Sequence, residues 1–566
     1  MSNLLEKASI LLTPTGYDNG SMNCIKPNTS VGDFDFTRGS SATRVNSQGL
    51  IENVQILGSE LYTKPGAPSL IESNFTLIQD GWSFSNGVAS IDGSQTGASR
   101  IRGGFGGAIL VTGTKYRVRI EGNITAFKPE FSGGGGYVAA PVGSVIGTRD
   151  YFITANHNHT TFSLICTSTG VGSVSSVSIK EVTDDTNLPR IDYSPYTGAG
   201  TCGHWLLEPQ TTNTATYSND FTQGDIFNES GNPTLSDTIL TANQGTAPDG
   251  TNTAQLLKDN NDGGSGQAGL SYFNTFVDAN DFNTFSVFVK KSLSNNFIYL
   301  STGGYDSVTG GATTDANGRS YFNIQDGTLG TVASAHTAKI EDYGSGWYRC
   351  SITNKTVTDL QGSFNVRLAT ADNTSTITRN GTNGVLLFGL QAEAHASRNF
   401  STSYIPTSGS TVTRNQDLAS NSGSSDLINS TEGVLYAEIA ALSEGQSVTT
   451  LTISNGSLSN RVLIALSNSE LKGQFVSSAN NINKTTSGVT IEEFNKIACF
   501  YTSTTFKVFV NGTQSGTTST SLTAVTGLNE LAFDRGDGGL DFIGKVKCVA
   551  VFKEALTDAE LTCLTS

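Results

Sequence analysis

Apolar and polar residues alternate with a period of two along most of this 566-residue chain. Three of the clearest runs are Thr114–Ile120, Thr284–Val289 and Thr505–Val510. Successive side chains of a strand point to opposite faces, so this period predicts half-buried β-strands. Clusters of Gly, Asn and Asp separate the runs, and Asn511-Gly512 directly after a strand predicts a tight hairpin turn. We therefore expect an all-β protein built of antiparallel β-sandwich domains in series.

The C-terminal residues 553–564 are the exception to this alternation, because Leu561 and Leu564 recur at a helical spacing. Thr557 and Glu560 have the spacing of a capping box, in which each side chain bonds the backbone N–H of the other. A short C-terminal helix is expected there.

The chain is too long for a single sandwich, since domains of about 150 residues are typical. Residues 1–58 hold too few alternating apolar residues for a core of their own. Two further stretches contain prolines, which exclude central strands: Pro189, Pro195, Pro209 and Pro406. The expected parts are an irregular N-terminal attachment segment at 1–58, sandwiches at 59–184 and 216–398, linkers at 185–215 and 399–430, and a last sandwich at 431–566.

Charged residues make up only 15% of the chain, and the formal net charge is −15. Nucleic-acid binding needs a basic surface that displaces counterions, and no segment concentrates Lys or Arg. We therefore expect no nucleic-acid partner. No apolar run has the length of a membrane span, and the first residues lack the pattern of a signal peptide. We expect no membrane insertion, and synthesis in a cytoplasm without secretion.

The seven cysteines are widely spaced and form no CxxC or Cys/His zinc pattern. Four of them lie within apolar strand runs: Cys166, Cys350, Cys499 and Cys548. We expect these to be small, reduced core residues.

Three short motifs lie in the N-terminal stretch and the two linkers. The first is Phe34-Asp-Phe-Thr-Arg-Gly-Ser-Ser-Ala-Thr-Arg-Val-Asn-Ser-Gln-Gly-Leu-Ile-Glu. The others are Pro189-Arg-Ile-Asp-Tyr with Trp205-Leu-Leu-Glu-Pro-Gln-Thr-Thr-Asn, and Ser403-Tyr-Ile-Pro-Thr with Thr413-Arg-Asn-Gln-Asp. Together they resemble segments of bacteriophage head and tail fibre proteins. The resemblance implies a structural protein of the virion surface, made in the host cytoplasm. Its implied partners are capsid or tail proteins and copies of itself, most often as a homotrimer.

The last domain contains Gly433-Val-Leu-Tyr-Ala-Glu-Ile, Phe506-Lys-Val-Phe-Val-Asn-Gly and Gly544-Lys-Val-Lys-Cys-Val-Ala-Val-Phe, the last of which leads into the expected helix. It resembles the concanavalin-like (laminin-G-like) jelly rolls. The two central domains look like the jelly rolls of carbohydrate-binding modules. These resemblances imply lectin-like modules with glycans as partners.

Catalytic motifs are missing from the sequence. None of the five histidines lies in a triad, an HExxH motif or a nucleophile elbow. His157 and His159 could point two imidazoles from one strand face toward a metal, but no third ligand is evident, and a solvated pair at a strand end is favoured. Glycosidases need two carboxylates facing each other across a cleft. Here Asp and Glu lie mainly in turns and linkers, although a distant pair stays open. We expect no enzymatic activity and name no catalytic residue.

A glycan site needs an aromatic platform for the apolar face of a sugar ring, with polar groups around it. Trp82 and Trp347 occupy similar strand starts, where burial in a core is favoured. Trp205 lies in a linker and is expected to fill a seam between domains. The glycine-rich loop Gly133–Tyr137 has an aromatic tip and suits either ligand contact or an inert turn. No residue stands out as the sugar platform.

A possible calcium site lies in the last domain, where Asp534, Asp537 and Asp541 fall on a glycine-rich loop. Hard oxygen ligands on a flexible loop suit Ca²⁺. The spacing is not that of an EF-hand, and an ordinary acidic turn is the alternative. The tripeptide Arg535-Gly-Asp within the loop is attributed to chance.

The N-terminal segment 1–58, in which Arg38 and Arg44 flank a Gly-Ser-Ser-Ala turn, cannot fold alone. We expect it to order over a partner or over symmetry mates and so to attach the fibre to the particle. The favoured hypothesis is a fibre that adheres multivalently to surface glycans. The alternatives are a purely structural capsid-decorating protein and a polysaccharide-degrading tailspike. Sandwich rims without an exposed aromatic would favour the first, and a cleft with paired carboxylates the second.

Overall fold

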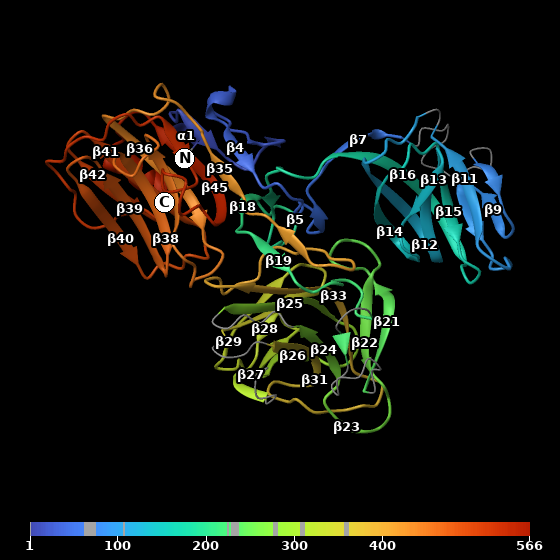
Figure 1. Cartoon of the computed structure of the whole chain (residues 1–566). Coiled ribbons are helices and arrows are strands. Elements are labelled where there is room, and N and C mark those ends of the chain that lie inside the picture. Colours follow the sequence, from blue (N-terminus) through green and yellow to red (C-terminus); the bar gives the residue numbers. More distant parts are fainter. Residues whose placement is uncertain are drawn as a thin grey trace.

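The computed structural model describes the chain except for residues 1, 62–74, 106–107, 223–225, 228–236, 275–280, 306–311 and 356–360. Antiparallel strands make up almost all of its secondary structure, which confirms the all-β prediction. Figure 1 shows three β-rich lobes, and an isolated β-bridge between Thr148 and Thr251 joins the first sandwich to the second. Among the described residues, no helix has the length and apolar character needed to cross a membrane.

The helical elements are α1 (Ser2–Leu5), the 3-10 turn η1 (Ser30–Gly32) and α2 (Asp558–Thr565). Helix α2 begins with the predicted capping box, since Thr557 and Glu560 each accept a hydrogen bond from the backbone N–H of the other. Its Leu561 and Leu564 are buried against the last sandwich.

The first sandwich consists of one ten-stranded sheet that folds around a single core. Its strands are β7 (Ile56–Glu60), β8 (Phe75–Ile78), β9 (Trp82–Ser85), β10 (Val88–Ile91), β11 (Ser99–Gly104), β12 (Lys115–Gly133), β13 (Gly136–Ala139), β14 (Gly143–Thr154), β15 (Thr161–Cys166) and β16 (Gly172–Asp184). The long β12 shifts register between Ile124 and Phe127. Its first half pairs with β14 and β16, and its second half pairs with β13 and β15, so one strand belongs to both layers.

The second sandwich consists of two six-stranded sheets and a small two-stranded one. The first sheet contains β20 (Ile226–Phe227), β24 (Gly269–Asn274), β26 (Phe297–Tyr305), β27 (Ala312–Asn323), β28 (Thr328–Leu329) and β31 (Gln361–Ala369). The second contains β21 (Thr238–Gly245), β22 (Ala254–Asp259), β25 (Phe282–Lys291), β29 (His336–Asp342), β30 (Trp347–Lys355) and β33 (Gly384–His395), and the small sheet is β23 (Ser265–Gly266) with β32 (Ile377–Thr378). The core joins the two large sheets, where the rings of Phe285 and Phe364 stack with centroids 4.7 Å apart.

The last sandwich packs a five-stranded sheet against an eight-stranded one. The smaller sheet contains β37 (Thr449–Ser454), β38 (Arg461–Ser467), β39 (Glu470–Val476), β40 (Asn481–Ser487) and β44 (Glu530–Ala532). The larger contains β36 (Glu432–Ala440), β41 (Asn495–Thr502), β42 (Phe506–Val510), β43 (Thr513–Gln514) and β45 (Gly544–Phe552), together with β1 (Ile10–Leu12), β17 (Ile191–Asp192) and β18 (His204–Leu207) from elsewhere in the chain.

Two of these added strands, β1 and β18, pair with the edge of β45 that β36 leaves open, and β17 extends the sheet beyond β18. Strand β1 pairs with Val549–Val551, and β18 pairs with Gly544–Val546. A further sheet of β2 (Tyr17–Asp18), β3 (Ser21–Met22), β4 (Phe34–Thr37) and β35 (Leu418–Ser420) joins the N-terminal segment to the second linker. Side chains of β1 and β4 are buried in the core of the last sandwich. This differs from the expectation that residues 1–58 order over a partner or symmetry mates, because the chain's own last domain supplies the missing core.

Two short two-stranded sheets lie where the segments meet: β5 (Thr43–Val45) with β6 (Ile51–Asn53), and β19 (Thr211–Asn213) with β34 (Val412–Arg414). The second of these connects the two linkers directly. The N-terminal segment and both linkers therefore form one ordered junction between the lobes.

Candidate functional site

A cluster of buried charges lies at this junction, which we call the hub: Arg38, Arg190, Glu208, Arg414 and Asp417. Arg190 bonds Glu208 through Nη1, 2.6 Å from Oε2, and Asp417 through Nη2. Arg38 lies 3.1 Å from Asp417, and Arg414 lies 2.5 Å from Glu208. Their side chains are at most 3% exposed. The hub therefore ties the N-terminal segment and both linkers together by ion pairs removed from water.

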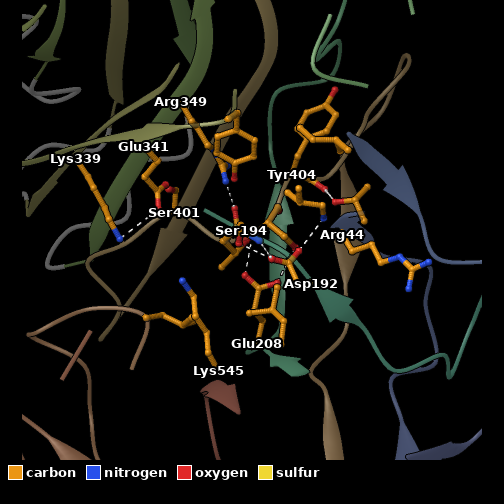
Figure 2. A pocket seen from close by; sticks show the side chains of 18 residues that line it. Arg44, Asp192, Ser194, Glu208, Lys339, Glu341, Arg349, Ser401, Tyr404 and Lys545 are labelled. Atoms are coloured by element: carbon orange, nitrogen blue, oxygen red, sulfur yellow. Dashed lines mark hydrogen bonds and ion pairs between the residues drawn. The ribbon is translucent and has the colours of Figure 1, made fainter. Parts of the chain in front are cut away.

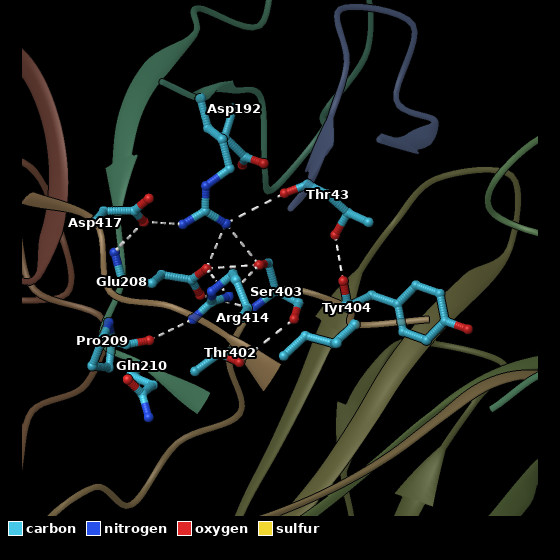
Figure 3. Close-up of polar contacts among 12 residues, drawn as sticks. Thr43, Asp192, Glu208, Pro209, Gln210, Thr402, Ser403, Tyr404, Arg414 and Asp417 are labelled. Carbon is cyan, nitrogen blue, oxygen red and sulfur yellow. Dashed lines mark hydrogen bonds and ion pairs between the residues drawn. The ribbon is translucent and has the colours of Figure 1, made fainter. Parts of the chain in front are cut away.

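Neutral groups complete the hub. Ser403 Oγ donates to Glu208 and accepts from Arg190 and Arg414. Figure 3 shows Ser403 beside Glu208 and Arg414. Arg190 also donates to the carbonyl of Thr43, and Arg414 to that of Pro209. Burial by itself would raise the pKa of Glu208, but Arg414, Arg190 and the hydrogen bonds from Ser403 hold that pKa below its usual range. The carboxylate is thus kept ionised in the interior.

The hub residues all come from the three motifs that resemble phage fibre segments. The sequence identified the motifs, but not that they would meet, because the motifs are separated by whole domains. Their contacts explain why Arg, Glu and Asp recur in segments without a core of their own.

A polar hollow opens beside the hub, between the second and last sandwiches. It consists of a cavity of about 60 Å³ and an adjoining hollow of about 240 Å³, which share Lys339, Glu341, Ser401 and Leu442. We call the two together the junction groove. Figure 2 shows its inner part, which Lys339 and Glu341 of β29 line from one side and Lys545 of β45 from another.

Lys339 links the two sandwiches across this groove. Its Nζ lies 3.3 Å from Glu341 of the same strand and 3.4 Å from Glu492 of the last sandwich. The pKa of Lys339 is raised mainly by Glu341, against the effect of burial. Burial would raise the pKa of Glu341, but Lys339 and Arg349 outweigh it and lower that pKa. Both carboxylates are therefore partners of one ammonium group.

The structure does not bring Asp534, Asp537 and Asp541 together as one ligand set. Asp537 forms a two-bond ion pair with Arg535, at 2.7 and 3.0 Å, and Asp541 accepts from Gln416 at 2.8 Å. Asp534 accepts from the backbone of Gly536 within its own turn. Within the described ranges, no group of three or more His, Cys, Asp or Glu side chains could hold a metal ion. Each carboxylate of this acidic loop therefore has a polar partner of its own, inside the turn for Asp534 and Asp537 and in the second linker for Asp541.

The three tryptophans are buried, as favoured from the sequence. Trp82 is 8% exposed, Trp347 is 2% exposed and donates to the carbonyl of Thr246, and Trp205 is 1% exposed. Trp205 lies on β18 and contacts Tyr17 edge to face, with centroids 6.3 Å apart. It therefore fills the seam between the N-terminal segment and the last sandwich.

The two candidate histidines lie on a loop between β14 and β15 rather than on a strand. His159 is fully buried and bonds the carbonyl of Gly133 and the side chain of Asn156. His157 is exposed, and its ring centroid is 6.0 Å from that of His159. The pair is thus neither wholly solvated nor arranged as metal ligands.

The four strand cysteines are buried and unbridged, as predicted. Burial raises the pKa of the Cys166 and Cys548 thiols to about 12, so they stay protonated and unreactive.

The structure is therefore a series of β-sandwiches whose connecting segments meet at a buried cluster of charged residues. Residues 435–562 match the family described as the concanavalin A-like lectin/glucanases superfamily, which confirms the resemblance drawn for the last domain. No curated protein matches the chain.

Among solved structures, the chain is similar to the Ruminococcus gnavus IT-sialidase CBM40 bound to α2,3-sialyllactose, at 17% identity and a TM-score of 0.22, over 24% of this chain and 84% of that one. The CBM22-1–CBM22-2 tandem of Paenibacillus barcinonensis Xyn10C is 11% identical, with a TM-score of 0.22, over 60% of this chain and 97% of that one. Domains LG4-5 of the mouse laminin α1 chain are 9% identical, with a TM-score of 0.19, over 62% and 92%.

Proposed function

We propose that this chain is a non-enzymatic fibre of a bacteriophage particle that adheres to surface glycans through its sandwich modules. The concanavalin-like match of the last domain and the fibre-like motifs of the hub support this proposal. The hub fixes the segments between the lobes, so that several modules are presented by one scaffold. Weak sites repeated in this way give effective adhesion, and a homotrimer would repeat them further.

The observation that carries adhesion is the exposed ring of Tyr137. The ring is 69% exposed, and in the described part of the chain every other tyrosine and tryptophan is buried or half-buried. Tyr137 lies on β13, just after the β12–β13 turn, and Asn156 Nδ2 donates to the backbone carbonyl of Tyr137 at 3.1 Å. His157 packs against this hairpin, because a Cβ at Gly136 would lie 2.4 Å from its Nδ1. An exposed aromatic ring on a hairpin whose backbone contacts an imidazole and an amide suits the apolar face and hydroxyls of a sugar.

The test compares Tyr137→Ala with Tyr137→Phe in the full-length chain on a glycan array. Stacking needs the ring but not its hydroxyl. Alanine is therefore expected to abolish binding at this site, while phenylalanine keeps most of it. Equal binding by wild type and Tyr137→Ala to every glycan would remove Tyr137 from the proposal. Unchanged melting temperatures of both variants are the control for folding.

Attachment to the particle is assigned to the N-terminal segment, which exposes Ile25 and Val31 on its surface at 47% and 49%. A purely structural decorating protein is the first alternative, and the exposed Tyr137 argues against it. A polysaccharide-degrading tailspike is the second. The carboxylates of Glu341 and Glu492 share one groove but are both ion-paired with Lys339, which suits binding better than proton transfer. Release of reducing sugar from a bound glycan would establish the enzyme instead.

A further inference from the structure

We propose that the junction groove binds an acidic saccharide whose anionic group pairs with Lys545. This deepens the proposed function, on which it rests for the sugar, by naming the ligand class and a second site. Four observations carry it: the place of the groove, its charges, its hydroxyl-rich walls and its size.

The groove lies where two sandwiches meet, which is a common place for ligand sites. Strand β29 and the second linker supply one wall, and Leu442, Ser443, Glu492 and Lys545 of the last sandwich supply the other. The hub beside it fixes the chain segments on which the walls depend. The site is therefore formed before a ligand arrives, which lowers the entropic cost of binding.

Four cationic and three anionic side chains line the inner cavity, although the chain as a whole has a net charge of −15. Each carboxylate already has partners: Asp192 accepts from the backbone of Val45 and Ser194, Glu208 belongs to the hub, and Glu341 pairs with Lys339.

Two of the cations, Lys545 and Arg349, form no hydrogen bond or ion pair with a carboxylate among the described residues, although the charges of both help to lower the pKa of Glu341. Lys545 has no hydrogen-bond or ion-pair partner in the ranges that the structure describes, and Figure 2 shows it pointing into the cavity. Arg349 is 2% exposed and donates to neutral groups: the Thr402 carbonyl at 2.6 Å, Ser286 Oγ at 2.9 Å and the side chain of Tyr343. A buried guanidinium and an ammonium group without a hydrogen-bond partner on one cavity favour an anionic group there.

The outer hollow is suited to the rest of a sugar. Half of its lining residues carry hydroxyl or amide side chains: Thr337, Ser351, Thr353, Asn399, Ser401 and Ser443. Such groups both donate and accept hydrogen bonds, as sugar hydroxyls require. Its volume of about 240 Å³ is below the roughly 300–1,000 Å³ of pockets for drug-sized ligands. It therefore fits one terminal sugar residue, with the remaining saccharide outside.

The test measures binding of three trisaccharides of the same linkage to the full-length chain by titration calorimetry: galacturonic acid, galactose and sulfated galactose. At least one acidic trisaccharide is expected to bind about tenfold or more tightly than the neutral one, because a charge-assisted hydrogen bond is roughly that strong. The acid that binds better identifies the anionic group as carboxylate or sulfate. High salt is expected to weaken this binding.

Lys545→Met is expected to reduce the affinity for the acidic trisaccharide at least about tenfold, down to that of the neutral one. The matched control is Lys547→Met, because Lys547 lies two residues along β45 over the ring of Phe494 and does not line the groove. Neither substitution removes an ion pair among the described residues, and melting curves check that both variants fold.

Two results would overturn the inference alone: no preference for the acids, or the same affinity in Lys545→Met as in wild type, while glycans still bind through Tyr137. Repeating the titration with Tyr137→Ala separates the two sites, since acid binding should persist in that variant. If no saccharide bound the wild-type chain at all, on the array or in solution, the proposed function would fail together with the inference.

Discussion

The first sandwich takes all its described strands from one stretch, between β7 and β16, whereas the last sandwich also uses strands from residues 10–12, 191–192 and 204–207. Figure 1 shows the N-terminal segment alongside the last sandwich and away from the strands of the first. Their ion pairs differ in the same way. Arg119 and Asp150 of the first sandwich pair near the surface, while the hub beside the last one is buried. A contiguous sandwich can complete its own core, but the last one depends on distant segments that the hub holds in place.

The largest expected effect comes from deleting residues 1–13, which removes β1. Ile10 and Leu12 are fully buried in the core of the last sandwich, and truncating such a side chain costs about 2–5 kcal/mol. We expect the free energy of unfolding of the last sandwich to fall by about 4–10 kcal/mol. Scanning calorimetry should show its transition lowered or lost while that of the first sandwich stays. If the first and last sandwiches of the wild-type chain unfolded in one transition, they could not be treated as separate units, and the comparison between them would fail.

Next in size is Arg190→Met, which removes the central cation of the hub. Breaking a buried ion pair from one side costs about 3–5 kcal/mol because a carboxylate is left poorly compensated. The matched control is Arg119→Met, whose pair has side chains 42% and 24% exposed and is expected to contribute about 1 kcal/mol or less. Denaturant unfolding measures both variants, and equal losses would contradict the distinction between the two regions.

The pH dependence of Glu208 is a smaller and sharper test. Its pKa is lowered in the folded chain, so its contribution to stability is present above its unfolded pKa of about 4.3 and is lost as pH falls below that value. Glu208→Gln is expected to be less stable than wild type at neutral pH. The gap should narrow as the pH is lowered below about 4. A gap that stays constant down to the lowest pH at which the chain folds would show that the carboxylate is not held ionised by the hub.

The smallest expected effect is that of calcium on the loop 534–541. Because its carboxylates already have partners, millimolar Ca²⁺ or its removal by EDTA should leave the melting temperature unchanged within about 1 °C. A rise of several degrees that Asp537→Asn abolishes would restore the calcium hypothesis for this turn.

The fold was predictable from the sequence where strands are long enough to show a period. The runs at 114–120, 284–289 and 505–510 lie almost wholly within β12, β25 and β42. The added strands were not predictable, because strands of two to four residues, such as Ile10–Leu12, are too short to show alternation. Their pairing partners on β45 are also remote in the chain, and pairing of that kind leaves no local pattern.

The site was predictable in part. The motifs containing Arg38, Arg190 and Arg414 were recognised, but nothing in their spacing indicated a common ion cluster. Lys545 lies in a strand of alternating burial, where the sequence predicts an outward lysine to be solvated. Only the structure shows that residues of the second sandwich face it. Conversely, Asp534, Asp537 and Asp541 were close enough to suggest a metal site. Their actual partners, Arg535 among them, became apparent only from side-chain geometry.

The most direct test of the account is a glycan-binding screen of the full-length chain, with reducing sugar assayed on every glycan that binds. The account predicts retention on at least one class of surface glycan, weakened by Tyr137→Ala, without any release of reducing sugar over time. Absence of binding to all glycans would contradict adhesion and favour a purely structural fibre. Steady release of reducing sugar would contradict the non-enzymatic proposal and favour a polysaccharide-degrading tailspike.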